Sequence, residues 1–240
     1  MKQLTLITVL ITILFTACTK ETKNTMTVSG NVKGLKKGTL YLQKIKDTAL
    51  VAVDSLLVDG DSDFRFTAEL ESPEVFYLYL NKKDGDEIND RITFFGEPTN
   101  ITINTDLEFF EVAAKIEGSE THKKLEQYKK MMSKFNERNL ELIKSNLEAR
   151  KDRDSLKADS IQKQADRNVI RGYLYTLNFA LTNKDSYIAP YIALSEAFDA
   201  KVKYLDTIYN SLSPEVADSK YGKQLDQYIK QIKEQEKGPQ

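Results

Sequence analysis

The chain has 240 residues, of which 40% are hydrophobic, and its 35 basic and 36 acidic side chains leave a formal net charge of −1. This length is sufficient for one large or two small domains. The near-neutral charge gives no basis for nucleic acid binding, which depends on basic excess. The single cysteine excludes a disulfide within the chain.

The N-terminus has the pattern of an export signal. Lys2 precedes an apolar segment from Leu4 to Phe15, which is too short for a bilayer core but typical of a signal peptide. The small residues Thr16 and Ala17 then lead to Cys18. This order resembles a bacterial lipoprotein signal, so residues 1–17 are predicted to be cleaved and Cys18 to be lipidated. A buried N-terminal helix and an uncleaved membrane anchor are the alternatives.

The residues that follow read as a short tether, 18–25. Its seven residues after Cys18 reach about 25 Å when fully extended, so the folded part is expected to lie close to the membrane. Thr19 occupies the position at which an aspartate alters sorting in Gram-negative bacteria, which favours the outer membrane. The sequence leaves open whether the protein faces the periplasm or the cell surface.

Residues 26–118 read as short strands separated by turns. Apolar and polar residues alternate in several of these segments, and Asp59-Gly60 is a turn signal. The pattern predicts an antiparallel β-sandwich or a partly open barrel. The expected strands are 26–32, 39–45, 49–58, 64–70, 75–80, 92–95, 101–103 and 109–116.

From Ser119 the apolar spacing becomes helical, and residues 119–233 are predicted to form an α-helical domain with a long hairpin. Ser119 is the expected N-cap. The charged segment 148–167 is interpreted as the hairpin tip, with an exposed helix or a loop as alternatives, and 234–240 as a flexible tail. The apolar row of the first helix continues through Leu140, Ile143 and Leu147. It could pack inside the hairpin or seat a partner helix. The expected fold class is therefore α+β.

The order of several short motifs resembles the DUF4369 domain of Bacteroidota lipoproteins, and together they cover nearly all of the mature chain. The motifs are Val28-Ser29-Gly30-Asn31-Val32, Gly38-Thr39-Leu40-Tyr41-Leu42, Asp54-Ser55, Asp59-Gly60 before Phe64-Arg65-Phe66, Pro73 to Leu80, Phe94-Phe95, Ile101-Thr102-Ile103, Ile116-Glu117-Gly118-Ser119, Tyr187-Ile188-Ala189-Pro190-Tyr191 and Ser219-Lys220-Tyr221-Gly222-Lys223.

The resemblance implies a fold and a compartment. In many relatives the helical segment leads into a thioredoxin-like domain with a Cys-x-x-Cys pair, whereas this sequence stops at Gln240 without such a pair. The resemblance therefore implies no redox chemistry in this chain.

The remaining candidates for chemistry are few. His122 is the only histidine, and its place beside Lys123 predicts a surface helix residue. Two acidic clusters raise the question of a metal site, but a polar turn and a solvated loop explain the same residues and are the favoured interpretations. These clusters are Asp59, Asp61 and Asp63, and Asp84, Asp86, Glu87 and Asp90. We expect no enzyme activity, no metal and no cofactor.

The best candidate for a recognition surface is an aromatic group, because aromatic residues are enriched at binding sites as well as in ordinary cores. The group consists of Tyr173, Tyr175, Phe179, Tyr187 and Tyr191. The expected function is a noncatalytic, lipid-anchored binding or scaffold module of the cell envelope with an envelope protein as partner. The alternative is an accessory subunit of an envelope thiol-disulfide system whose cysteines are on another chain.

Overall fold

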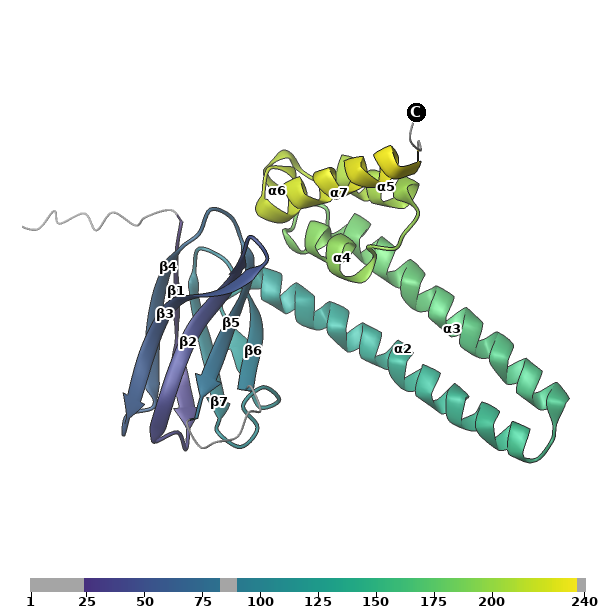
Figure 1. Cartoon of the computed structure of the whole chain (residues 1–240), viewed down its shortest axis with the longest axis horizontal. Helices are drawn as coiled ribbons and strands as arrows, with labels where there is room; N and C mark the ends of the chain where they lie inside the picture. Colours follow the sequence, from purple (N-terminus) through teal and green to yellow (C-terminus); the bar gives the residue numbers. More distant parts are fainter. Residues whose placement is uncertain (1–23, 83–89, 237–240) are drawn as a thin grey trace, which may run out of the picture.

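The computed structural model describes residues 24–82 and 90–236, which form a β-sandwich followed by an α-helical module (Figure 1). This arrangement confirms the α+β prediction. The sandwich has two open sheets of four strands and no closed barrel. Its strands are β1 (Thr25–Lys33), β2 (Lys37–Lys46), β3 (Ala49–Asp59), β4 (Asp63–Glu69), β5 (Glu74–Asn81), β6 (Asp90–Gly96), β7 (Asn100–Asp106) and β8 (Lys115–Glu117).

The strand order is β4-β1-β7-β8 in one sheet and β3-β2-β5-β6 in the other. All strand pairs are antiparallel except β1 with β7, which run parallel with Gly30 opposite Ile103. A Cβ atom at Gly30 would lie 1.7 Å from the Ile103 carbonyl oxygen, so the close approach of the two strands at this point requires a glycine.

The core lies between the two sheets and is built from the alternating apolar positions of the strands. β4 shows the pattern most clearly, because Phe64, Phe66 and Ala68 are buried while the residues between them are exposed. Phe76 and Phe94 of the opposite sheet stack at 6.0 Å between ring centroids. The period-two reading of the sequence therefore identified the buried face correctly.

The predicted strand 109–116 is wrong. Local hydrogen bonds hold this segment in turns instead: the Asp106 side chain accepts the Phe109 N–H at 2.7 Å, and the Phe109 carbonyl accepts the Ala113 N–H at 2.8 Å. Phe110 turns into the core and is 2% exposed. Only β8, three residues long, pairs with β7.

The helical module begins with a hairpin of two long antiparallel helices and ends with four shorter helices beside the sandwich (Figure 1). Its elements are α2 (Glu120–Lys151), α3 (Ser155–Thr182), α4 (Ile188–Glu196), α5 (Val202–Ser211), α6 (Pro214–Ala217) and α7 (Lys220–Glu236). At 1.5 Å per residue the two hairpin helices extend about 48 and 42 Å. Within the described ranges, every helix is too short or too polar to cross a bilayer.

The hairpin tip lies within the charged segment where it was predicted. Asp152 ends α2, Arg153 takes a left-handed conformation with φ of 59°, and the Asp154 side chain caps α3 by accepting the Lys157 N–H at 3.0 Å. The rest of segment 148–167 is helical. Residues 234–236 of the predicted flexible tail are helical, because α7 continues to Glu236, and residues 237–240 lie outside the described range.

Candidate functional site

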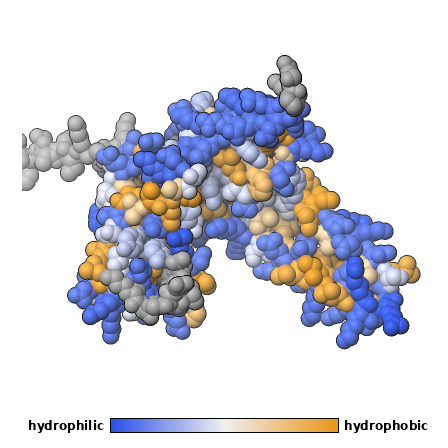
Figure 2. Space-filling view, in the orientation of Figure 1, coloured by the Kyte–Doolittle hydropathy of each residue, from blue (hydrophilic) through white to orange (hydrophobic). Residues whose placement is uncertain are grey.

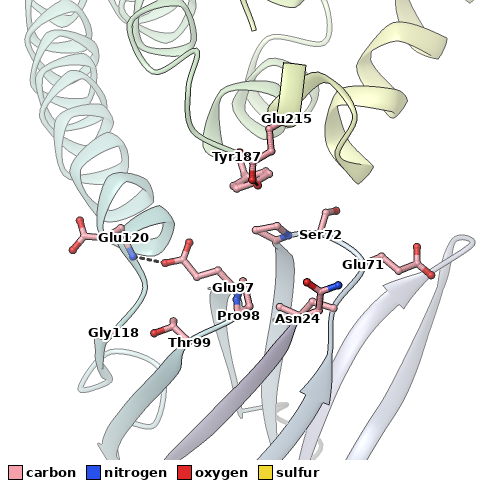
Figure 3. A pocket seen from close by; sticks show the side chains of 12 residues that line it. Asn24, Glu71, Ser72, Glu97, Pro98, Thr99, Gly118, Glu120, Tyr187 and Glu215 are labelled. Carbon is pink, nitrogen blue, oxygen red and sulfur yellow. Dashed lines mark hydrogen bonds between the residues drawn. The ribbon is translucent and has the colours of Figure 1, made fainter. Parts of the chain in front are cut away.

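The start of α2 is fixed to the end of the sandwich by two capping groups. As predicted, Ser119 is the N-cap, and its hydroxyl accepts the His122 N–H at 3.0 Å. The Glu97 carboxylate, which follows β6, accepts the Glu120 N–H at 2.5 Å and the Thr121 hydroxyl at 2.6 Å (Figure 3). A carboxylate at a helix N-terminus also interacts favourably with the helix dipole. The hairpin therefore leaves the sandwich in a defined direction.

His122 is not the surface residue that its neighbours suggested. It is 4% exposed and its Nδ1 accepts the Phe95 N–H at 3.3 Å, which links α2 to β6. The proton of the neutral ring is therefore on Nε2, which lies 3.6 Å from a Glu126 carboxylate oxygen. Burial, with a smaller contribution from Lys129, lowers the pKa of His122 to about 4, so the ring is neutral at physiological pH.

A second contact between the modules is an aromatic cluster over the end of β5 and β6. Phe95 packs edge-on against Tyr191 of α4 at 5.7 Å and tilted against Tyr221 of α7 at 6.0 Å between centroids. The Tyr221 hydroxyl also accepts the Val75 N–H at 3.1 Å. Burial raises the pKa of Tyr221 well above its ordinary value, so the hydroxyl stays protonated.

An ion triplet centred on a buried carboxylate lies beside this cluster, and its two lysines are half-buried. Glu74 of β5 is 4% exposed, and its carboxylate binds Lys44 of β2 at 2.8 Å and also Lys220 at the start of α7. Lys220 donates a further hydrogen bond to the Ile45 carbonyl at 3.0 Å, and its backbone N–H donates to the Ser72 hydroxyl at 3.0 Å. Together, the aromatic cluster and the triplet fasten α7 to the sandwich.

The predicted aromatic group is divided between several contacts. Tyr175 and Phe179 of α3 pack around Tyr128 of α2, at 6.0 and 5.1 Å between centroids. Tyr191 belongs to the cluster with Phe95, and Tyr173 packs against the core of the shorter helices. The structure therefore gives these four residues packing roles inside the helical module or at its junction with the sandwich, and Tyr187 packs at the edge of the same cluster.

The fifth residue, Tyr187, borders a pocket of about 590 Å³ between the end of the sandwich and α6 (Figure 3). The Tyr187 hydroxyl donates to the Glu215 carboxylate at 2.5 Å, and burial and this hydrogen bond raise the pKa of Tyr187 to about 12. Glu71, Glu97 and Glu120 also line the pocket. Glu97 caps α2, Glu215 binds Tyr187 and Glu120 pairs with Lys123 at 3.7 Å, so three of the four carboxylates have partners.

The first acidic cluster, Asp59, Asp61 and Asp63, forms no metal centre in the described part of the chain. Asp61 accepts the Asp63 N–H at 3.0 Å, and Asp63 accepts the Asn31 side-chain amide at 2.6 Å, so both shape the turn between β3 and β4. Asp84, Asp86 and Glu87 lie outside the described residues, and Asp90 is described only as the first residue of β6. Within residues 24–82 and 90–236 no three His, Cys, Asp or Glu side chains converge on one point. Cys18 and residues 1–23 lie outside the described range as well.

The two hairpin helices pack along a regular seam of side chains that contains two hydrogen-bonded asparagines. The buried or half-buried residues of α2 recur every three or four positions, as in a coiled coil. Two asparagines on the seam bind the facing helix, since Asn146 donates to the Ala158 carbonyl and Asn168 to the Phe135 carbonyl, both at 2.8 Å. The α2 seam residues are Leu125, Tyr128, Met132, Phe135, Asn139, Leu142, Asn146 and Ala149.

Another set of apolar side chains lies beside this seam and faces solvent. We call Leu140, Ile143, Leu147 and Val169 the exposed hairpin row; they are 67, 46, 63 and 59% exposed. Ile143, Leu147 and Val169 also border a groove of about 350 Å³ between α2 and α3. Figure 2 shows hydrophobic surface along the hairpin. The apolar stripe predicted for α2 is therefore divided. Its seam residues pack inside the hairpin, while the exposed hairpin row remains accessible.

Sequence reasoning missed Phe95, Glu74, Lys220 and His122 as junction residues. The burial of Glu74 could have been predicted, because it lies an even number of residues from Phe76 and Leu78 and so shares their buried face of β5. A carboxylate at such a position needs a cationic partner.

Residues 26–125 match a protein family described as "Domain of unknown function (DUF4369)". Comparison with curated proteins and with solved structures found no match. The matched range covers both sheets and the first two turns of α2, and so includes Ser119 and His122, which join the helix to the sandwich. Residues 26–125 of the chain therefore match the DUF4369 domain.

Proposed function

We propose that the protein is a noncatalytic lipoprotein of a Gram-negative envelope, anchored in the outer membrane through acyl groups on Cys18. It acts as a binding or scaffold module that holds its helical hairpin out from the membrane-proximal sandwich. The exposed hairpin row is the surface that binds an envelope protein, and the chemistry it suits is an amphipathic helix with an apolar face.

The order of residues 1–18 supports the anchor. A chain acylated on the thiol and the amino group of Cys18 carries more than one hydrocarbon chain, which gives stable attachment. β1 begins at Thr25, so six residues, 19–24, separate Cys18 from the sandwich. Because the sandwich and the hairpin are joined by α2, its caps and the aromatic cluster, the hairpin keeps a fixed orientation relative to the anchored end.

The exposed hairpin row is the single observation that carries the binding proposal. Covering its four side chains would remove apolar surface worth about 5 kcal/mol before the costs of association. A two-helix hairpin needs only its seam, so the row is additional apolar surface on α2 and α3. The opposite side of α2 carries Arg138 instead.

The anchor is tested by metabolic labelling with an alkyne analogue of palmitate. Wild-type protein should incorporate the label, fractionate with outer membranes and accumulate as precursor in globomycin, whereas Cys18→Ala should do none of these. Equal labelling of both forms, or unmodified wild-type protein that retains residues 1–17, would refute the anchor.

The binding surface is tested by placing a photo-crosslinking amino acid at Leu140 or Leu147, with Arg138 of the same helix as the matched control. Crosslinks to one defined protein should form from the two row positions only, and Ile143→Glu should abolish them. Equal crosslinking from Arg138, or none from the row in intact cells, would rule out this surface.

A further inference from the structure

β3 is an edge strand with a free hydrogen-bonding side. It spans eleven residues, Ala49–Asp59, and among the strands of the described ranges only β2 pairs with it. Eight of its residues are exposed, and Leu50, Val53 and Leu57 are 42, 38 and 67% exposed. An edge strand of this kind presents backbone N–H and C=O groups that fit another strand.

The neighbouring edge strand β4 is built differently. Its exposed positions include Asp63, Arg65 and Glu69, and charges of this kind discourage pairing with another chain. β3 contains neither lysine, arginine nor proline, and Asp54 is its only charge before the terminal Asp59. Of the two edges on this side of the sandwich, β3 is therefore the one suited to receive a strand.

A β-bulge in β3 reverses the alternation of inward and outward side chains halfway along the strand. The pairing with β2 shifts between Leu42 and Gln43, so Val53 is the extra residue. Residues paired across two strands share a face, and the partners of β2 place Leu50 and Ala52 before the bulge, and Ser55 and Leu57 after it, on the outer face. Val51 and Leu56 lie on the inner face. Each half of β3 therefore offers apolar residues on both faces.

We propose that two copies of this chain associate through antiparallel pairing of their β3 strands, about a two-fold axis between Val53 and Asp54. In this register Leu57 lies opposite Leu50 of the second copy on the outer face, and Leu56 lies opposite Val51 on the inner face. The two four-stranded sheets become one sheet of eight strands. A two-fold axis of this kind needs a self-complementary surface. β3 provides one, because the residues that would lie opposite each other face the same side of the sheet.

Asp54 sets the strength of this association. Near the two-fold axis the carboxylates of the two copies come close to each other, and like charges at such a distance oppose pairing. Asp54 also accepts the N–H of Ser55 within its own strand at 2.7 Å. Removing the charge of Asp54 is therefore expected to strengthen the dimer. Pairing of β3 with the strand of a different protein would not bring two Asp54 carboxylates together, so it would not give this effect.

The register is tested by disulfide trapping in full-length Cys18→Ala protein, which contains no other thiol. Leu50→Cys with Leu57→Cys should give an oxidised dimer, because residue 50 of one copy lies opposite residue 57 of the other. Each single substitution is the matched control. Seven residues separate the two positions along the strand, so neither like pair comes within the Cα distance of about 7 Å that a disulfide allows.

Sedimentation of the same full-length protein without added cysteines gives the second measurement. Asp54→Asn should raise the dimer fraction several-fold at fixed concentration, Leu57→Lys should lower it several-fold, and Thr67→Lys on the β4 edge should leave it unchanged. A trapped dimer in the double-cysteine form together with these shifts supports the proposal. Equal trapping of the single-cysteine forms, a monomer for both wild type and Asp54→Asn, or disulfides only to a different protein would overturn it.

Discussion

At the residue scale, His122 shows how a junction changes the chemistry of one side chain. Its position beside Lys123 and Lys124 resembles a solvated helix face, yet the ring lies against β6 and accepts the Phe95 N–H. Phe95 is 27 residues away in sequence. The burial of His122 therefore depends on the direction in which α2 leaves the sandwich. The charges of the neighbouring residues do not predict that direction.

The low pKa of His122 predicts a loss of stability in mild acid. The unfolded chain binds a proton near pH 6.5, whereas the folded ring does so only near pH 4. The folded state is therefore unaffected above pH 6.5 and loses up to about 3 kcal/mol as the pH falls to 4. Urea unfolding at pH 7 and pH 4.5 measures this loss. His122→Gln, which cannot titrate, should show a smaller pH dependence than wild type; the same dependence in both proteins would contradict the assignment.

At the element scale, the sequence predicted the strands, the hairpin and the N-cap Ser119 because each depends on local periodicity or capping. It did not predict that β1 and β7 run parallel, since alternation specifies which face is buried and not which strand lies beside it. The strand expected over 109–116 failed for a local reason, the hydrogen bonds of Asp106 and Phe109.

The helices offer a matched pair of glycines with opposite expectations. A Cβ at Gly172 in α3 would lie 3.6 Å from Phe135 Cγ, which is an ordinary contact, so Gly172→Ala should stabilise the protein by about 0.5–1 kcal/mol through helix propensity. A Cβ at Gly222 in α7 would lie 2.3 Å from the Val216 carbonyl oxygen, so Gly222→Ala should destabilise it. Thermal unfolding separates the two cases, and shifts of the same sign would refute the packing described for these helices.

At the scale of the whole molecule, the junction joins residues that are far apart in the chain. Val75 and Tyr221 are 146 residues apart, as are Glu74 and Lys220. The predicted aromatic group included Tyr191 but not its contacts Phe95 and Tyr221, because sequence spacing identifies an apolar helix face without identifying what covers it. The candidate site could therefore be predicted in part, as residue types on helices, while its geometry required the fold.

The buried carboxylate of Glu74, which pairs with the half-buried Lys44 and Lys220, predicts a stability cost at this junction. Glu74→Ala removes the carboxylate that both lysines share and should lower the free energy of unfolding by about 1–3 kcal/mol. Asp226→Ala, which breaks the surface pair with Lys230 in α7, is the control and should cost much less, because exposed ion pairs contribute little to stability. A double-mutant cycle with Lys220→Ala measures the coupling. Additive losses would show that the lysine and the carboxylate act independently.

The position of β1 has a mechanical consequence. This strand follows directly on the N-terminal segment and lies inside its sheet, with seven residue pairs to β4 on one side and seven to β7 on the other. Tension applied at Asn24 along the strand would load both ladders in shear, so their hydrogen bonds must rupture together instead of unzipping one after another. In the lipid-anchored protein that we propose, a pull on the anchor would therefore reach a strand that is held on both sides.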